Sequence, residues 1–321
     1  MNNLELFDIY KNSNSSDDQL ILDGLKDDNQ KKIDSKFFYD EYGSHLFEEI
    51  TKLDEYYPTR IELNILENYN KIINNFLPRN ASIIEFGSGS NKKIKKLLGA
   101  LDNPVEYIPI DISKSFLFNN AKRFAKNYPD IKVTAICAEF NQSIELNSII
   151  KTNRNNVGFF PGSTIGNFSP VNARNLLKKF AHILGEKNYL IIGVDLRKEK
   201  ELMEKAYNDS LGLTAKFNKN ILNTINDKLG SMFDQDKFEH TAFFNEIEKR
   251  IEMHLVSKID HTVELLGQNI EFLKGESIHT ENSYKYSLKE FELLANESGF
   301  SSYKIMKDDK DLFSIFILKV I

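Results

Sequence analysis

The feature that most constrains this chain is a regular alternation of short apolar runs and helix-length segments between residues 82 and 194. The runs with the content of buried strands are Ser82–Phe86, Val105–Ile110, Lys132–Ala138, Val157–Phe160 and Tyr189–Val194. The segments between them include Ala173–Leu184, where apolar residues recur at helical spacing. Strands that are separated by helices pair in parallel, so this region predicts a doubly wound α/β sheet.

The alternation of strand-like and helix-like segments ends after Asp195. Two helices are predicted at Glu199–Leu211 and Ala215–Leu229, and the alternation in Arg250–Lys258 and Thr262–Leu266 indicates antiparallel strands. Residues 196–285 therefore form an insertion, which we expect to act as a lid or a substrate-binding subdomain. Beyond it, a Ser287 capping box predicts a helix, and the strand-like runs Tyr303–Met306 and Leu312–Val320 predict a closing hairpin.

The N-terminal region predicts less structure. Up to about Lys36 the chain is rich in Asn, Ser, Asp and Lys, and favours only a short amphipathic helix around Leu20–Leu25. The first strong helix follows Pro58, where Thr59 and Glu62 fit a capping box and apolar residues recur at helical spacing as far as Phe76.

Composition excludes several classes of protein. The 321 residues are 41% hydrophobic, which is enough for a core without disulfides, and 47 acidic residues outnumber 42 basic ones. A net charge of −5 argues against binding to nucleic-acid backbones. The single cysteine, Cys137, lies in an apolar run, where we expect a buried side chain, and it favours a reducing cytoplasm. No signal-like segment occurs, and no apolar run approaches the ~20 residues of a membrane span.

A glycine-rich turn, Glu85-Phe86-Gly87-Ser88-Gly89-Ser90, follows the first strand of the alternation. Glycines at such a turn let backbone N–H groups approach a ligand. Asp111 lies 22 residues after Gly89, at the end of the second strand, where a carboxylate can accept both hydroxyls of a ribose. The third strand ends in Glu139-Phe140, which suits the edge and face of an adenine, although Glu139 is also explained as a solvated loop acid.

The turn favours one cofactor over another. A dinucleotide site has a third glycine that brings the helix against the pyrophosphate, whereas Lys92 and Lys93 occupy this part of the chain. Glu85 at the start of the turn suits a ligand with a cationic sulfonium and a free amino acid tail. S-adenosylmethionine therefore fits better than NAD.

Several longer motifs carry a resemblance to a known family. They occur in one order: Phe38-Tyr39-Asp40, Gly43-Ser44-His45-Leu46-Phe47, Glu55-Tyr56-Tyr57-Pro58-Thr59-Arg60, the glycine-rich turn, Phe160-Pro161-Gly162-Ser163-Thr164-Ile165-Gly166-Asn167, Gly193-Val194-Asp195-Leu196, Ala206-Tyr207-Asn208-Asp209 and Thr280-Glu281-Asn282-Ser283-Tyr284-Lys285. Together they resemble the EgtD-like L-histidine Nα-methyltransferases of ergothioneine biosynthesis. The resemblance extends from Phe37 to the C-terminus.

The resemblance implies a fold and a reaction. The fold is a class I methyltransferase domain, with a mainly parallel, seven-stranded, Rossmann-like sheet that ends in an antiparallel hairpin, joined to an α+β substrate-binding domain. The implied division is 62–195 with 286–321 for the S-adenosylmethionine domain, and 1–61 with 196–285 for the substrate domain. The implied reaction is trimethylation of the α-amine of L-histidine to hercynine, in a cytoplasmic monomer that uses neither membrane nor nucleic acid.

Residue roles follow from the same resemblance. Tyr39 and Asn167 would orient the amine, and Tyr207 and Asn167 would bind the substrate carboxylate. Glu281 would accept an N–H of the imidazole and Ser283 would bond its other nitrogen, since residues two apart on an extended segment point to one face. The remaining pocket residues would be Tyr56 and Met253. The cofactor contacts would be Gly87, Lys93, Asp111, Glu139 and Phe140, with Lys93 preferred to Lys92 on spacing alone.

Two further expectations concern alternatives. His240, His254, His261 and His279 are scattered without metal-ligand spacing, so no catalytic metal is expected. An N-methyltransferase for another amino acid or aromatic amine is one competing interpretation, and a non-catalytic S-adenosylmethionine-binding protein is another. The Glu281–Ser283 pair argues against the first, and the presence of Tyr39 and Asn167 argues against the second.

Overall fold

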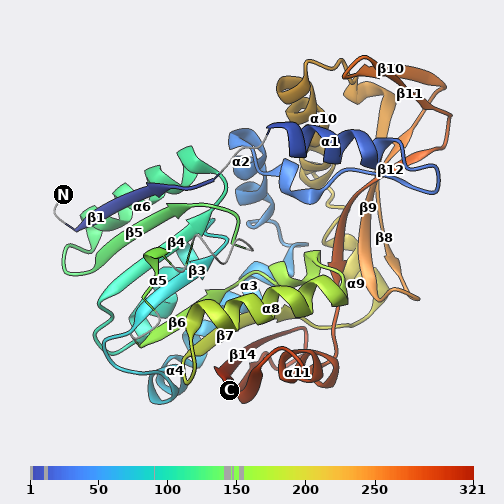
Figure 1. Ribbon diagram of the computed structural model, residues 1–321. Coiled ribbons are helices and arrows are strands. Elements are labelled where there is room, and N and C mark those ends of the chain that lie inside the picture. Colours follow the sequence, from blue (N-terminus) through green and yellow to red (C-terminus); the bar gives the residue numbers. More distant parts are fainter. Residues whose placement is uncertain (1–2, 11–13, 90, 141–145, 147, 152–154) are drawn as a thin grey trace. The chain divides into compact units, whose positions relative to one another are not determined.

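The computed structural model describes residues 3–10, 14–89, 91–140, 146, 148–151 and 155–321 (Figure 1). The described residues form two compact units. The first unit takes its residues from 1–11, 58–197 and 284–321, and the second from 12–57 and 198–283. Ser90 of the glycine-rich turn lies outside the described residues.

The first unit is built on an eight-stranded sheet. In spatial order its strands are β1 (Leu4–Asp8), β5 (Lys132–Cys137), β4 (Glu106–Asp111), β3 (Ser82–Phe86), β6 (Asn156–Phe160), β7 (Tyr189–Asp195), β14 (Phe313–Val320) and β13 (Phe300–Lys307). The strands from β1 to β7 pair in parallel, and β14 and β13 add the antiparallel hairpin. The doubly wound sheet and its closing hairpin are therefore confirmed.

Strand β1 corrects two expectations. A seven-stranded sheet was predicted, with the whole of 1–61 in the substrate domain, yet Leu4 pairs with Val133 and Asp8 with Cys137 at the edge of the sheet. The side-chain amide nitrogen of Asn3 lies within 3.2 Å of three backbone carbonyl oxygens in 125–131, and its two N–H groups fix the start of the strand there. Cys137, as expected, is buried.

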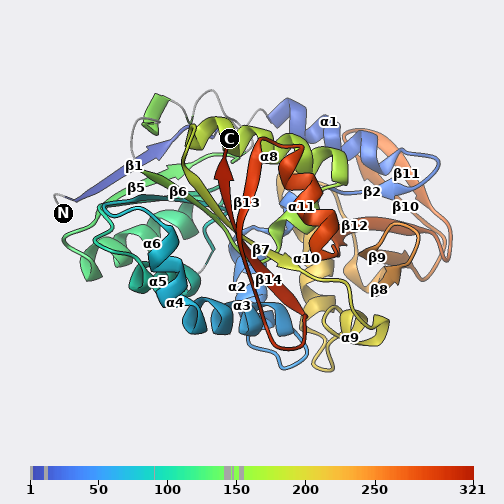
Figure 2. The ribbon, with the colours of Figure 1, turned by 90° about the horizontal axis from the view of Figure 1, so that it is seen from below.

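Helices cover both faces of this sheet, because each strand alternates its apolar side chains between two cores. One core packs α8 (Pro170–Leu184) and α11 (Leu288–Asn296) against residues such as Ile84 and Phe86. The other packs α3 (Tyr57–Asn68), α4 (Asn70–Phe76), α5 (Lys92–Ala100) and α6 (Lys114–Asn127) against residues such as Ile83. Figure 2 shows α5 and α6 across the sheet from α8 and α11.

The helix predicted after Pro58 differs from expectation in two ways. It is broken at Tyr69 into α3 and α4. It also begins at Tyr57, so Thr59 lies inside the first turn, and the Glu62 carboxylate accepts from the backbone N–H of Gly162. The capping box predicted from Thr59 and Glu62 is therefore wrong. The box predicted at Ser287 is confirmed, since Ser287 and Glu290 bond each other's backbone N–H.

The second unit contains a four-stranded sheet and a hairpin. The sheet order is β2 (Lys31–Lys32), β12 (Ser277–Tyr284), β9 (Arg250–Ser257) and β8 (Phe238–Asn245), and the hairpin pairs β10 (His261–Leu265) with β11 (Gln268–Phe272). Its helices are α1 (Asn14–Leu25), α2 (Glu41–Ile50), α9 (Lys200–Lys205) and α10 (Leu213–Leu229), with short 3-10 turns η1 (Ser35–Phe38) and η3 (Gln235–Lys237).

Helix α10 is the centre of this unit. It contacts η1 and α2 as well as β8 and β9, and its Phe217 stacks on Phe38 at 4.6 Å between ring centroids. Gly230 ends α10 in a left-handed conformation, as the sequence predicts. The helix predicted at Glu199–Leu211 is only the short α9. Within the described residues, no helix is both long and apolar enough to cross a bilayer.

Candidate active site

The predicted cofactor residues follow the ends of neighbouring strands of the first unit. Gly87 follows β3, Asp111 ends β4 and Glu139 follows β5. The chain order of the strands reverses between β3 and β6, and ligands of open α/β sheets bind at the carboxyl ends of the strands beside such a point. The loop that follows β6 leads into η2 (Thr164–Asn167), which ends at Asn167. All of these residues therefore lie at or beyond the carboxyl ends of the parallel strands.

The glycine-rich turn is shaped by its backbone. Gly87 has φ of +75°, a conformation that side chains disfavour, and a Cβ built there would lie 3.6 Å from the Phe140 ring. The backbone N–H groups of Gly87 and Ser88 both donate to the Ile110 carbonyl at 2.9 Å, which joins the turn to β4. No described atom lies within 4 Å of a Cβ built at Gly89. The turn thus has Phe140 on one side and open space at Gly89.

Glu85 is buried beneath this turn. Its carboxylate accepts from Ser88 Oγ at 2.8 Å and from the hydroxyl of Tyr107. Desolvation raises the pKa of Glu85 to about 7, against the two hydroxyl donors and the charge of Lys93. Glu85 therefore holds the turn through its hydrogen bond with Ser88, and its pKa lies near neutral pH.

Asp111 is oriented by the start of α6. Its Oδ1 accepts from the backbone N–H of Ser113 at 2.8 Å. Desolvation raises the pKa of Asp111 to about 6, opposed by the hydrogen bonds from Ser113. The carboxylate is therefore mostly ionised at neutral pH, as acceptance from two ribose hydroxyls requires.

Lys93 is joined to a residue that the sequence did not single out as part of the site. Its Nζ forms an ion pair with Glu62 Oε2 at 2.6 Å, and the Glu62 side chain is fully buried. The same carboxylate accepts from Gly162 N at 2.9 and 3.0 Å. A Cβ at Gly193 would lie 2.1 Å from Glu62 Oε1, so any side chain at this position would displace the Glu62 carboxylate. Glu62 therefore connects the predicted cofactor residue Lys93 to the loop that leads to Asn167.

Three of the sequence motifs are joined by hydrogen bonds and an ion pair near the carboxyl ends of the parallel strands. Gly162 and Ser163 both have positive φ, which bends the loop after β6 sharply. Ser163 Oγ accepts from the backbone N–H of Asp195 at 2.8 Å. Asp195 in turn forms a buried ion pair with Lys285 at 2.6 Å. The motifs around residues 163, 195 and 285 therefore fix the loop geometry that precedes Asn167.

In the second unit, the structure brings together several predicted substrate residues. The Tyr207 hydroxyl donates to Ser283 Oγ at 2.8 Å, and Tyr56 packs edge-on against the Tyr207 ring at 6.4 Å. Glu281 and Ser283 both belong to β12, where Glu281 is half-buried and Ser283 is buried. Met253 on β9 is buried, and its carbonyl oxygen lies 3.0 Å from Thr280 Oγ1.

Tyr39 is held by the residues on either side of it. It follows η1, and its ring packs edge-on against Phe47 and Phe217 at 5.9 and 5.8 Å. Asp40 caps α2 by accepting from Gly43 N at 2.6 Å, and it also accepts from Asn220 on α10. The half-buried Tyr39 ring is thus fixed between α2 and α10 of the second unit.

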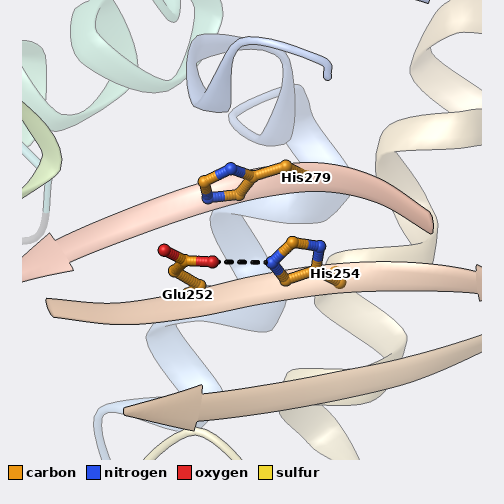
Figure 3. Close-up of side chains that lie close together, drawn as sticks. All are labelled: Glu252, His254 and His279. Carbon is orange, nitrogen blue, oxygen red and sulfur yellow. Dashed lines mark hydrogen bonds and ion pairs between the residues drawn. The ribbon is translucent and has the colours of Figure 1, made fainter. Parts of the chain in front are cut away.

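The structure corrects the expectation that the histidines are scattered. Ligating atoms of Glu252, His254 and His279 lie within 4.8 Å of one another (Figure 3). His254 Nε2 is 3.0 Å from Glu252 Oε2, and the two imidazoles stack at 4.6 Å with planes 13° apart. Desolvation and His254 lower the pKa of His279 to about 4, which keeps it neutral. Because the ring planes are nearly parallel, their nitrogen lone pairs do not converge on one point.

Comparisons with known proteins identify the family to which this chain belongs. The family described as histidine-specific, S-adenosylmethionine-dependent methyltransferases matches residues 16–320. The chain belongs to this family. As a histidine-specific methyltransferase, it is an enzyme of the class I methyltransferase fold, as its sheet order also indicates.

Individual relatives cover most of the chain. Histidine N-alpha-methyltransferase of Mycolicibacterium smegmatis is 36% identical over 261 residues, which is 80% of each chain. Ergothioneine biosynthesis protein 1 of Schizosaccharomyces pombe is 30% identical over 282 residues, which is 84% of this chain and 36% of that protein. Among solved structures, the CcbJ methyltransferase of Streptomyces caelestis aligns with a TM-score of 0.48 at 12% identity, covering 81% of this chain and 96% of that one.

Proposed function

We propose that this methyltransferase transfers three methyl groups from S-adenosylmethionine to the α-amine of L-histidine. The product is hercynine, and the reaction is the first step of ergothioneine biosynthesis. The observation that supports the proposal is the buried hydrogen bond between Tyr207 and Ser283, with Glu281 two residues before Ser283 on β12; Ser283 and Glu281 would be polar partners for the two nitrogens of an imidazole.

The imidazole contacts follow from hydrogen-bond directions. The Ser283 oxygen accepts from Tyr207, so the Ser283 proton can be donated to the unprotonated imidazole nitrogen. The Glu281 carboxylate then accepts from the imidazole N–H. Tyr56 and Met253 supply the apolar walls, which exclude water and strengthen both polar contacts.

The carboxylate and the amine of the substrate need other groups. We assign the carboxylate to Asn167 and Tyr207, whose hydroxyl proton is shared between Ser283 and the substrate. We assign the amine to Tyr39 and Asn167, whose oxygens accept from its N–H groups and aim its lone pair. After methylation the amine keeps fewer N–H donors, and its cation can rest against the ring of Tyr39.

The methyl donor is already activated, so the protein's main tasks are to orient the reactants and to exclude water. The residues of the first unit suit S-adenosylmethionine. Asp111 can accept from the ribose, Phe140 and Glu139 offer a face and an acceptor to the adenine, and Gly87 with Lys93 lies at the turn for the amino acid tail. We accordingly assign cofactor binding to the first unit and recognition of the imidazole to the second.

A panel of substrates tests the proposal. Purified protein is incubated with S-adenosylmethionine and each of the twenty amino acids, and the products are weighed by mass spectrometry. We expect histidine alone to gain one, two and then three methyl groups. Methylation of another amino acid, with histidine unmodified, would overturn the substrate assignment while leaving the methyltransferase family in place.

A further inference from the structure

Asn218 lies in the middle of α10 and is fully buried. Its amide nitrogen donates to His240 Nδ1 at 2.8 Å and to the His254 carbonyl at 3.0 Å. Its amide oxygen accepts from Thr280 Oγ1 at 2.6 Å. Both N–H groups and the oxygen of this side chain are therefore engaged, on three different strands of the second unit.

His240, on β8, links Asn218 to the backbone of Tyr207. Its Nε2 lies 2.8 Å from the backbone carbonyl of Tyr207. A carbonyl only accepts, so Nε2 bears the proton, and in the neutral ring Nδ1 accepts from Asn218. Desolvation lowers the pKa of His240, while the charges of Asp209 and Lys219 act on it in opposite directions. The neutral ring is thus the form that fits both of its partners.

These hydrogen bonds, with Tyr207 itself and the segment of β12 between Thr280 and Ser283, form a closed ring. From Thr280 on β12 the ring runs through Asn218 and His240 to the carbonyl of Tyr207, and the Tyr207 hydroxyl returns it to Ser283 on the same strand. The segment between the two attachment points on β12 contains Glu281. Two bonds, at Thr280 and Ser283, therefore hold the strand on either side of Glu281.

We propose that Asn218 and His240 are positioning residues for recognition of the substrate's imidazole, which they achieve by holding Glu281, Ser283 and Tyr207 in register. The proposal rests on the proposed function. Neither residue contacts the substrate in this account; each acts through the hydrogen-bond ring. The two polar partners of the imidazole lie on one strand, and a shift of that strand by a fraction of an ångström misaligns both bonds at once.

An isosteric variant, Asn218→Asp, tests the ring. The introduced carboxylate faces the lone pair of His240 Nδ1 and the His254 carbonyl, so the neutral ring is repelled and a protonated ring is favoured. We expect the KM for histidine to rise about tenfold or more near pH 8, with the Kd for S-adenosylmethionine unchanged. The ratio of variant to wild-type KM should fall toward about pH 6, because His240 then gains a proton that pairs with the introduced carboxylate.

Asn226→Asp is the matched control on the same helix. Asn226 also bonds three groups, Phe233 N, Phe233 O and Ser231 Oγ, but none of them belongs to β12. Its KM for histidine should equal that of the wild type at every pH. Should Asn218→Asp fail to fold, Thr280→Val removes one link of the ring with little change of volume, and its KM for histidine should rise about fivefold.

The outcomes are distinct. An Asn218→Asp KM equal to the wild type, a pH-independent KM ratio, or an equal loss of cofactor affinity overturns the inference. The same holds if Thr280→Val leaves the KM unchanged. If the wild-type protein does not methylate histidine, the proposed function fails, and this inference fails with it.

Discussion

The hydroxyl of Tyr207 donates to Ser283 Oγ at 2.8 Å, and both side chains are buried. Tyr207 lies just beyond α9 and Ser283 near the end of β12, so the bond joins two parts of the second unit that are far apart in sequence. It sets the direction of the Ser283 proton, and that direction decides what Ser283 can offer to a ligand.

Tyr207→Phe removes this bond. We expect the KM for histidine to rise about tenfold, because Ser283 loses a partner that orients it and the substrate carboxylate loses a proposed donor. Tyr286→Phe is a matched control: the Tyr286 hydroxyl is buried and makes no hydrogen bond to the described residues. That control should keep the wild-type KM in steady-state assays. Equal effects of the two variants would contradict a specific role for the bond.

Glu281→Ala separates the two ligands. It removes the proposed acceptor for the imidazole N–H, so calorimetry should show histidine affinity reduced at least about tenfold and cofactor affinity unchanged. Glu271→Ala, an exposed glutamate on β11 of the same unit, should leave both affinities unchanged. A parallel loss of histidine and cofactor binding in Glu281→Ala would refute the proposed pocket.

The buried ion pair between Lys285 and Asp195 predicts a large stability effect. Their side chains are 0% and 1% exposed, so Lys285→Met leaves a buried carboxylate without its cation and should reduce the free energy of unfolding by about 3–5 kcal/mol. Lys307→Met breaks an exposed pair with Asp311 and should cost less than about 1 kcal/mol. Thermal melting compares them, and equal melting temperatures would be inconsistent with this account.

The raised pKa of Glu85 predicts a pH dependence of stability. Its pKa is about 7 in the folded protein and near 4.5 when unfolded, so between these values the folded state holds more protons. Stability should therefore fall as pH rises through this window, by up to about 3 kcal/mol from this group. Glu85→Gln should flatten the curve measured by urea unfolding between about pH 4.5 and about pH 7. Parallel curves for the two proteins would show that Glu85 does not titrate there.

Much of the first unit could be predicted from sequence, because its strands are fully buried and its helices amphipathic. Strand β1 could not, since the five residues Leu4–Asp8 gain their structure by pairing with β5, more than a hundred residues away. In the second unit, β8 and β11 alternate more buried and more exposed residues, but β11 has only two buried side chains and the inner face of β8 includes the polar His240, so their sequences do not mark them as strands. The local pattern of apolar residues does not predict a strand where pairing with distant residues decides the structure.

The candidate site also contains some residues that could be predicted from sequence and others that could not. Gly87 and Asp111 could be found because a strand-to-helix turn and a strand end impose local requirements. The sequence predicts that Glu62 caps a helix, and this is wrong, because a glutamate near a helix start gives the same pattern whether it bonds the helix backbone or Gly162. Asn218 and His240 belong to no motif, and only the fold brings them to β12 and Tyr207.

The position of the methyl groups on histidine after reaction with S-adenosylmethionine shows which nitrogen is the acceptor. Tandem mass spectrometry and NMR of the product should show three methyl groups on the α-nitrogen and an unmodified imidazole. Methyl groups on a ring nitrogen, or histidine recovered unchanged while the cofactor is consumed with another amine, would contradict the account.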